Sequence, residues 1–307
     1  KTKIPDADEE GYREKLEREF GCLENILDML CENLGEMNKL WIRIGSLIKD
    51  KKKRKQERGE LKLTVGENIV RLASIQGLTV EIYKNKLLPV LLEHIVSSGD
   101  KISQQYLMDC VVHAFSDEFH LETLDILLKA TEDLNPKVNL REIYIKLMER
   151  FAEFSKNSEA EHLKVDMGSI YNMFKNSISN VVNKQQGEEI QLNKLLELQA
   201  AFIKFCVHTF PDKINYVDEI MQISVTLCGK VRPAEYTEEV LDSIVQILIH
   251  PLETMSIVVL NLAQYPKLMG YLPFAKRKTV SLKIVEAVIS SKTYLINTDI
   301  LNKLVGF

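Results

Sequence analysis

A ten-residue pattern occurs twice in this chain, at residues 112–121 and again at residues 207–216. In each copy a histidine and a phenylalanine end an apolar run, and an aspartate precedes the next one. Apolar residues recur at spacings of three and four on both sides, which is typical of helices with one apolar face. Two short helices cannot bury two such faces alone, so further helix pairs must stack beside them.

The two copies lie 95 positions apart, about twice the roughly 40–47 residues of a HEAT- or armadillo-type helix pair. A weaker third copy begins at Tyr265-Pro266. No segment has the pattern of a strand. The spacing therefore predicts an all-α fold, an irregular HEAT/armadillo-like α-solenoid of stacked antiparallel helix pairs.

Each copy of the pattern is expected to form the corner between two helices. Phe115 and Phe210 should lie between neighbouring helix pairs rather than in solvent. Asp117 is expected to cap the helix that follows it, because its carboxylate can accept first-turn N–H groups. The residues predicted at the two corners are His113, Phe115, Asp117, Phe119, His208, Phe210, Asp212 and Ile214.

The composition agrees with many helices joined by short corners. Of the 307 residues, 45% are apolar and 27% charged, and only 13 are glycine and 8 proline. We expect Pro89 to kink a helix over residues 83–96, and His250-Pro251 to end another helix. The chain starts in a charged helical pattern without a methionine and stops in an apolar one. We therefore predict one solenoid segment over residues 1–307 that belongs to a longer protein.

The net charge of −4 argues against a general nucleic-acid binder, which is usually basic. The local exception is a basic run inside a charged segment, residues 49–60, that is predicted to be a loop. One interpretation is contact with an anionic membrane surface, worth about 1 kcal/mol per basic residue. The alternatives are phosphate contact with nucleic acid and a solvated loop or frayed helix end. The run consists of Lys51, Lys52, Lys53, Arg54 and Lys55.

Neither a membrane-spanning segment nor a signal peptide is predicted from the sequence. No run approaches the roughly 18–20 apolar residues that cross a bilayer. The first residues also lack the apolar core of a signal peptide.

No catalytic motif is present: the chain has no GxxxxGK[ST] loop, no GxGxxG after a strand, no HExxH and no GxSxG. Cys110 and His113 have half of a metal-site spacing, but no second pair completes a four-ligand set. As a nucleophile, Cys110 would be inert, because burial on an apolar face raises the pKa of a thiol. The five scattered cysteines are typical of a reducing compartment. The sequence thus predicts no enzyme activity, no catalytic residue, no cofactor and no metal.

Three stretches have the order and spacing seen in one known family. They are EMNKLWIR at 36–43, followed by ERGELKLTVGENIVRLASIQG at 57–77; QYLMDCVVHAFSDEFHLETL at 105–124; and PDKINYVDEIM at 211–221. They resemble the large subunit of the retromer complex, the vacuolar protein sorting-associated protein 35 family. The resemblance covers most of the chain. It is strongest across residues 36–125 and looser after about residue 230.

The resemblance implies a non-catalytic scaffold that is cytoplasmic and peripheral on the cytosolic face of endosomal membranes. Such a scaffold supports retrieval of transmembrane proteins to the Golgi or the plasma membrane. The implied partners are an arrestin-like subunit, a metallophosphoesterase-fold subunit, sorting nexins and a Rab GTPase. The membrane surface is implied indirectly, and nucleic acid is not.

This chain departs from the family in several places. The family's Pro-Arg-Leu-Tyr-Leu motif and its carboxy-terminal half, which serve the two main partners, are absent, so neither partner site maps onto a residue here. Ser116 stands where proline is usual, and His113 where glutamine is common. The alternative function is a helical-repeat adaptor for nucleic acid or nuclear import, which would need the basic run to lie on a broad positive surface.

Overall fold

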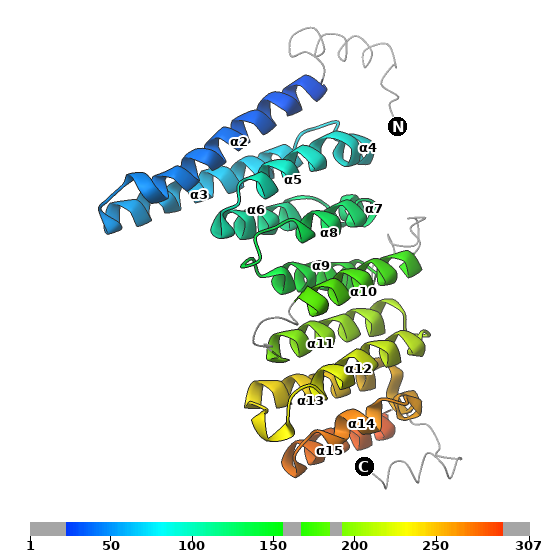
Figure 1. The fold of residues 1–307 in the computed structure, drawn as a ribbon. Coiled ribbons are helices and arrows are strands. Elements are labelled where there is room, and N and C mark those ends of the chain that lie inside the picture. The colour runs from blue at the N-terminus through cyan, green and yellow to red at the C-terminus, as the bar shows by residue number, and fades with distance from the viewer. Residues whose placement is uncertain (1–22, 156–166, 185–191, 291–307) are drawn as a thin grey trace, which may run out of the picture. The chain divides into compact units, whose positions relative to one another are not determined.

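The computed structural model describes residues 23–155, 167–184 and 192–290 (Figure 1). Within these ranges every regular element is a helix, and sequential helices pack in neighbouring pairs, so the predicted all-α solenoid is confirmed. The chain divides into two compact units, Lys1–Asn139 and Leu140–Phe307, which are described separately. The single solenoid segment over residues 1–307 stays a prediction.

The first unit arranges its described helices in two layers. In one layer α5 packs against both α2 and α8, and in the other α6 packs against α3. Contacts of α2 with α3 and of α5 with α6 join the layers. The elements are α2 (Leu23–Leu47), α3 (Lys51–Ala73), α4 (Val80–Ile82), the π-helical turn η1 (Tyr83–Leu87), α5 (Leu88–Ser97), α6 (Lys101–Ala114), α7 (Asp117–Glu122) and α8 (Leu124–Glu132).

The predicted charged loop over residues 49–60 is wrong from Lys51 onward, because α3 begins there. Asp50 caps the helix by accepting a hydrogen bond from the Lys53 N–H at 2.7 Å. One turn further on, Gln56 donates a hydrogen bond to Glu60 at 3.1 Å. Long unbranched side chains lose little rotamer freedom in a helix, so a charged run with a good cap remains helical.

The kink expected at Pro89 takes the form of the π-helical turn η1 (Tyr83–Leu87), after which α5 (Leu88–Ser97) starts with Pro89 in its first turn. The helix continues through this turn, because the Leu88 N–H donates to the Tyr83 carbonyl, five residues back. Proline has no N–H to donate, and a π-helical turn is one way in which a helix accommodates such an interruption. The expected end at His250-Pro251 is wrong. Helix α13 runs through Pro251 and ends at Met255.

The second unit repeats the layered arrangement in its own described helices. α11 packs against both α9 and α13, and α13 against α15. α12 contacts α11 and α14, which places it in the other layer. The elements are α9 (Leu140–Phe154), α10 (Met167–Lys184), α11 (Leu192–Thr209), α12 (Ile214–Cys228), the 3-10 turn η4 (Pro233–Glu235), α13 (Glu238–Met255), the 3-10 turn η5 (Ser256–Asn261), α14 (Tyr265–Gly270) and α15 (Phe274–Ser290).

Two glycines in α3 predict opposite effects of the same substitution. A Cβ on Gly66 would lie 2.2 Å from Tyr106 Oη, whereas a Cβ on Gly59 would meet nothing within 4 Å. Gly66→Ala should therefore overpack the α3–α6 contact and lower the unfolding free energy by about 1–3 kcal/mol. Gly59→Ala should raise it by roughly 0.5–1 kcal/mol through helix propensity. Urea unfolding of the two variants measures both, and equal stabilisation would contradict the close approach of α3 and α6.

Candidate functional site

The basic run lies at the end of the α2–α3 hairpin, which extends past α5 and α6 in the same unit (Figure 1). The side chains of Lys51, Lys52, Lys53 and Lys55 are exposed. Arg54 is partly buried and donates a hydrogen bond to the Ile48 carbonyl at 3.4 Å. The structure thus gathers four lysine ammonium groups at one protruding helix start.

The electrostatics of this hairpin end favour an anion. The first turn of α3 contains no acidic residue, and the capping carboxylate of Asp50 offsets part of the positive amino-terminal end of the helix, so the lysines supply most of the attraction. The ion pair between Lys53 and Glu57 spans 3.6 Å between exposed side chains, so it offsets little of this charge. Leu47 is 69% exposed beside the lysines. Exposed lysines next to an exposed leucine can meet an anionic surface.

The first corner is a packing unit. Phe115 is only 2% exposed, and its ring centroid lies 4.5 Å from that of Tyr83. Phe119 is half-buried and packs on the same tyrosine at 5.0 Å. The exposed His113 donates from Nδ1 to the Asp109 carbonyl at 2.7 Å, so it stabilises its own helix.

Capping at the first corner differs from the expectation for Asp117. Ser116 occupies the N-cap position of α7, and its side chain makes no capping bond, while Asp117 is the first helical residue. There the carboxylate still complements the positive end of the helix. Sequence reasoning missed His120, which is fully buried and donates from Nε2 to the Val112 carbonyl at 3.1 Å.

The second corner packs through aromatic rings. Phe210 is half-buried, with its ring centroid 5.9 Å from Phe205 and 5.4 Å from Tyr216. Asp212 is exposed, and Ile214 is the half-buried first residue of α12. No capping side chain serves this helix start, because Lys213 occupies the N-cap position. The two corners therefore share packed aromatic rings, and neither helix start has a side-chain cap.

The candidate thiols are deactivated by their surroundings. Burial raises the pKa of Cys110, and burial likewise raises the pKa of Cys206 well above its ordinary value. Among the described residues no group of three or more His, Cys, Asp or Glu side chains could hold a metal ion. Cys110 and His113 are not brought into a ligand set.

The surroundings of His250 predict that the free energy of unfolding falls in acid. Burial lowers the pKa of His250 below 6.5, and Lys204 and His208 add to this effect, whereas Glu253 opposes it. Below about pH 6.5 the unfolded chain therefore binds a proton that the folded chain does not, so the unfolding free energy should fall as the pH falls. Urea unfolding at about pH 7.5 and pH 5.5 should show a smaller pH difference for His250→Gln. An unchanged difference would remove His250 as the cause.

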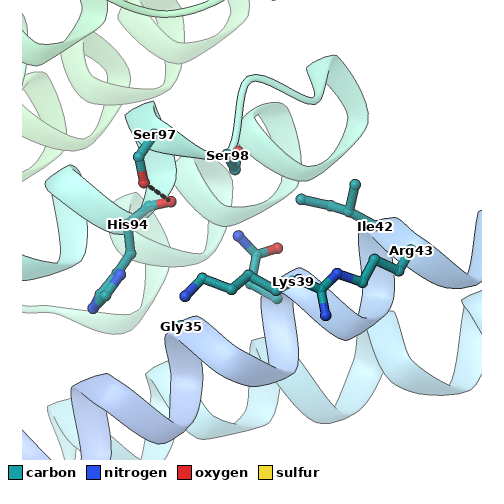
Figure 2. A pocket seen from close by; sticks show the side chains of 8 residues that line it. Gly35, Lys39, Ile42, Arg43, His94, Ser97 and Ser98 are labelled. Atoms are coloured by element: carbon teal, nitrogen blue, oxygen red, sulfur yellow. Dashed lines mark hydrogen bonds between the residues drawn. The ribbon is translucent and has the colours of Figure 1, made fainter.

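A small pocket lies between α2 and α5 and has a volume of about 190 Å³. Lys39 and Arg43 on α2 face His94, Ser97 and Ser98 on the other side (Figure 2). The remaining lining residues are Gly35, Asn38 and Ile42. The lining combines basic and polar groups with the apolar side chain of Ile42.

Comparison with known proteins identifies the family to which the chain belongs. A family model described as vacuolar protein sorting-associated protein 35 matches residues 1–307. The chain belongs to the vacuolar protein sorting-associated protein 35 family. Vacuolar protein sorting-associated protein 35C of Arabidopsis thaliana is 33% identical to it over 285 residues, which cover 90% of this chain and 35% of that protein. Vacuolar protein sorting-associated protein 35 of Dictyostelium discoideum is 32% identical over 314 residues, which cover 99% of this chain and 38% of that protein.

The chain therefore spans somewhat over a third of the length of these members of the vacuolar protein sorting-associated protein 35 family. The two relatives are named as sorting proteins, which agrees with the resemblance found in the sequence. Within the described residues, no helix combines the length and apolar character needed to cross a bilayer.

Proposed function

We propose that this chain is a non-catalytic scaffold segment of the retromer cargo-retrieval coat. The observation that carries the proposal is the family match over residues 1–307, on a chain whose described helices stack in neighbouring pairs. Each helix pair contacts only its neighbours, so the stack has a length set by the number of pairs. Such an element holds partners bound at its two ends at a defined distance.

In this proposal the scaffold works on the cytosolic face of endosomal membranes and supports the retrieval of transmembrane proteins. Its end partners are an arrestin-like subunit and a metallophosphoesterase-fold subunit, while sorting nexins and a Rab GTPase recruit the assembly. The names of the relatives as sorting proteins favour this function over the nucleic-acid or nuclear-import adaptor. A salt titration tests that adaptor, because phosphate contacts would make nucleic-acid affinity fall steeply with salt.

A chimera tests the scaffold function. In Dictyostelium cells that lack their own family protein, a full-length copy would carry this chain in place of its matching 314-residue stretch. We expect this chimera to enter the complex and to restore the retrieval of a transmembrane cargo. A chimera that folds and binds both end partners, yet restores no retrieval, would contradict the proposal.

We further propose that the hairpin end contacts an anionic membrane surface through Lys51, Lys52, Lys53, Arg54 and Lys55. Neutralising the four exposed lysines to glutamine should reduce sedimentation with anionic vesicles at least tenfold, since each basic residue near such lipid contributes about 1 kcal/mol. The matched control carries four exposed lysines changed elsewhere: Lys129, Lys137, Lys213 and Lys230. Equal losses in both variants, or no loss in either, would rule out the hairpin end as a specific contact.

A further inference from the structure

The pocket between α2 and α5 has a charge pattern that the scaffold function does not use. Three of its lining side chains bear basic nitrogen groups, Lys39, Arg43 and His94, and none of the eight described lining residues is a carboxylate. Its volume of about 190 Å³ is enough for one carboxylate or phosphate group but small for a larger ligand.

The basic side chains of the pocket already act on a carboxylate of the protein itself, that of Glu36. Glu36, one turn before the lining residue Lys39, accepts a hydrogen bond from Lys39 Nζ at 2.6 Å. That bond and the charge of Lys39 lower the pKa of Glu36, and Arg43 and His94 lower it further. All three side chains thus favour the charged form of one carboxylate. The Glu36 side chain is 70% exposed, so this surface pair is weak enough for another anion to displace it.

The wall of the pocket formed by α5 repels an anion less than an uncovered carboxy-terminal helix end would. This wall is formed by the carboxy-terminal end of α5, and the carbonyl groups at such an end are partly negative. Ser97 Oγ donates to the His94 carbonyl at 3.3 Å, and Ser98 Oγ donates to the Ile95 carbonyl at 2.7 Å. The two hydroxyl groups therefore cover part of that negative end.

Gly35 permits the position of His94. A Cβ at residue 35 would lie 2.8 Å from Cε1 and 2.9 Å from Nδ1 of the His94 ring, closer than real contacts allow. Only glycine lets the imidazole lie against the backbone of α2. The absence of a side chain at Gly35 therefore allows His94 to bring a third basic nitrogen to the two cations of α2.

We propose that this pocket binds the carboxylate or phosphate group of an acidic peptide segment in a partner protein. The pocket is recessed between two helices, so its ligand must enter as a narrow group on a flexible chain. A flat bilayer instead meets protruding surfaces such as the hairpin end. Arg43 and Lys39 supply charge-assisted hydrogen bonds, the strong kind for a carboxylate or phosphate. This inference does not depend on the sorting role.

Fluorescence anisotropy with the full chain tests the pocket, using a labelled polyglutamate peptide at about 0.1 M salt. A phosphoserine peptide forms a second arm, and a polyglutamine peptide of equal length serves as the uncharged reference. Arg43→Gln should lower the affinity for the acidic peptides about tenfold, the usual loss for one hydrogen bond to a charged group. Lys230→Gln removes the same charge from an exposed site in the second unit and should change the affinity less than about twofold.

Gly35→Ala separates geometry from charge, because it retains Lys39, Arg43 and His94 and displaces only the His94 ring. It too should weaken peptide binding, in a protein whose melting curve still shows a folded state. Lys39→Gln provides a second charge variant if Arg43→Gln lowers the melting temperature. Equal losses for Arg43→Gln and Lys230→Gln would overturn the proposal, as would the absence of saturable binding to either acidic peptide. Binding of anionic vesicles through Arg43, without binding of the peptides, would overturn the peptide as the ligand.

Discussion

Phe115→Ala is expected to lower the unfolding free energy by about 3–5 kcal/mol, the range for large aromatic truncations in protein cores. Phe115 is 2% exposed and packs against Tyr83, so its removal leaves a cavity at the junction of α6, α7 and η1. Close-packed neighbours relax only partly into such a cavity, which is why the loss exceeds the hydrophobic transfer energy. Urea unfolding followed by circular dichroism measures the effect.

The control for Phe115→Ala is Leu63→Ala in α3, where the side chain is 62% exposed. Its unfolding free energy should stay within about 0.5 kcal/mol of the parent value, as is usual for surface substitutions. Similar stabilities of the two variants would mean that Phe115 does not support the stack, and the corner would lose its structural role.

Phe202→Ala is expected to cost a similar amount, about 3–5 kcal/mol, in the second unit. Phe202 is 1% exposed and lies at the centre of a group of aromatic rings. Its ring stacks on Tyr171 with centroids 5.4 Å apart, and Phe174 and Phe205 lie 6.4 and 6.3 Å away. Aromatic pairs of this kind contribute about 0.5–1.5 kcal/mol beyond the area that they bury.

The same substitution at an exposed phenylalanine supplies the control for Phe202. Phe274, at the start of α15, is 78% exposed, so Phe274→Ala should leave thermal and urea stability nearly unchanged. If Phe274→Ala destabilised the chain as much as Phe202→Ala, the aromatic group in the second unit would not be the main source of its stability.

The recurring pattern around Phe115 and Phe210 was enough to predict the helical class and both corners. Helical periodicity depends on residues three and four apart, so it can be followed in the sequence alone. The prediction of a loop at Lys51–Lys55 is wrong because a run of like charges is typical of a loop. The capping residue Asp50 is a local signal that favours a helix instead. His250-Pro251 was misassigned because the helix continues through a proline on a buried face.

The pocket could not be predicted from the sequence. Gly35 and His94 lie far apart in the chain and meet only because α2 packs against α5. The nearby buried hydrogen bond from Ser103 Oγ to Asn38 Oδ1, at 2.6 Å, likewise joins residues 65 positions apart. Local spacing contains no information on such contacts, and a glycine in a helix can be neutral or essential depending on what faces it.

The proposed scaffold function assigns two partner subunits to the ends of the full-length protein, and the distance between them is its most direct test. Removing one helix pair, residues 167–209, from the full-length protein should bring the partners closer by about 8–10 Å, one interhelical spacing. Cryo-electron microscopy of the assembled complex, or spin-label distances between the partners, measures the change, and a cooperative thermal melt verifies that the shortened protein is folded. A shortened, folded protein that binds both partners at an unchanged distance would contradict the account.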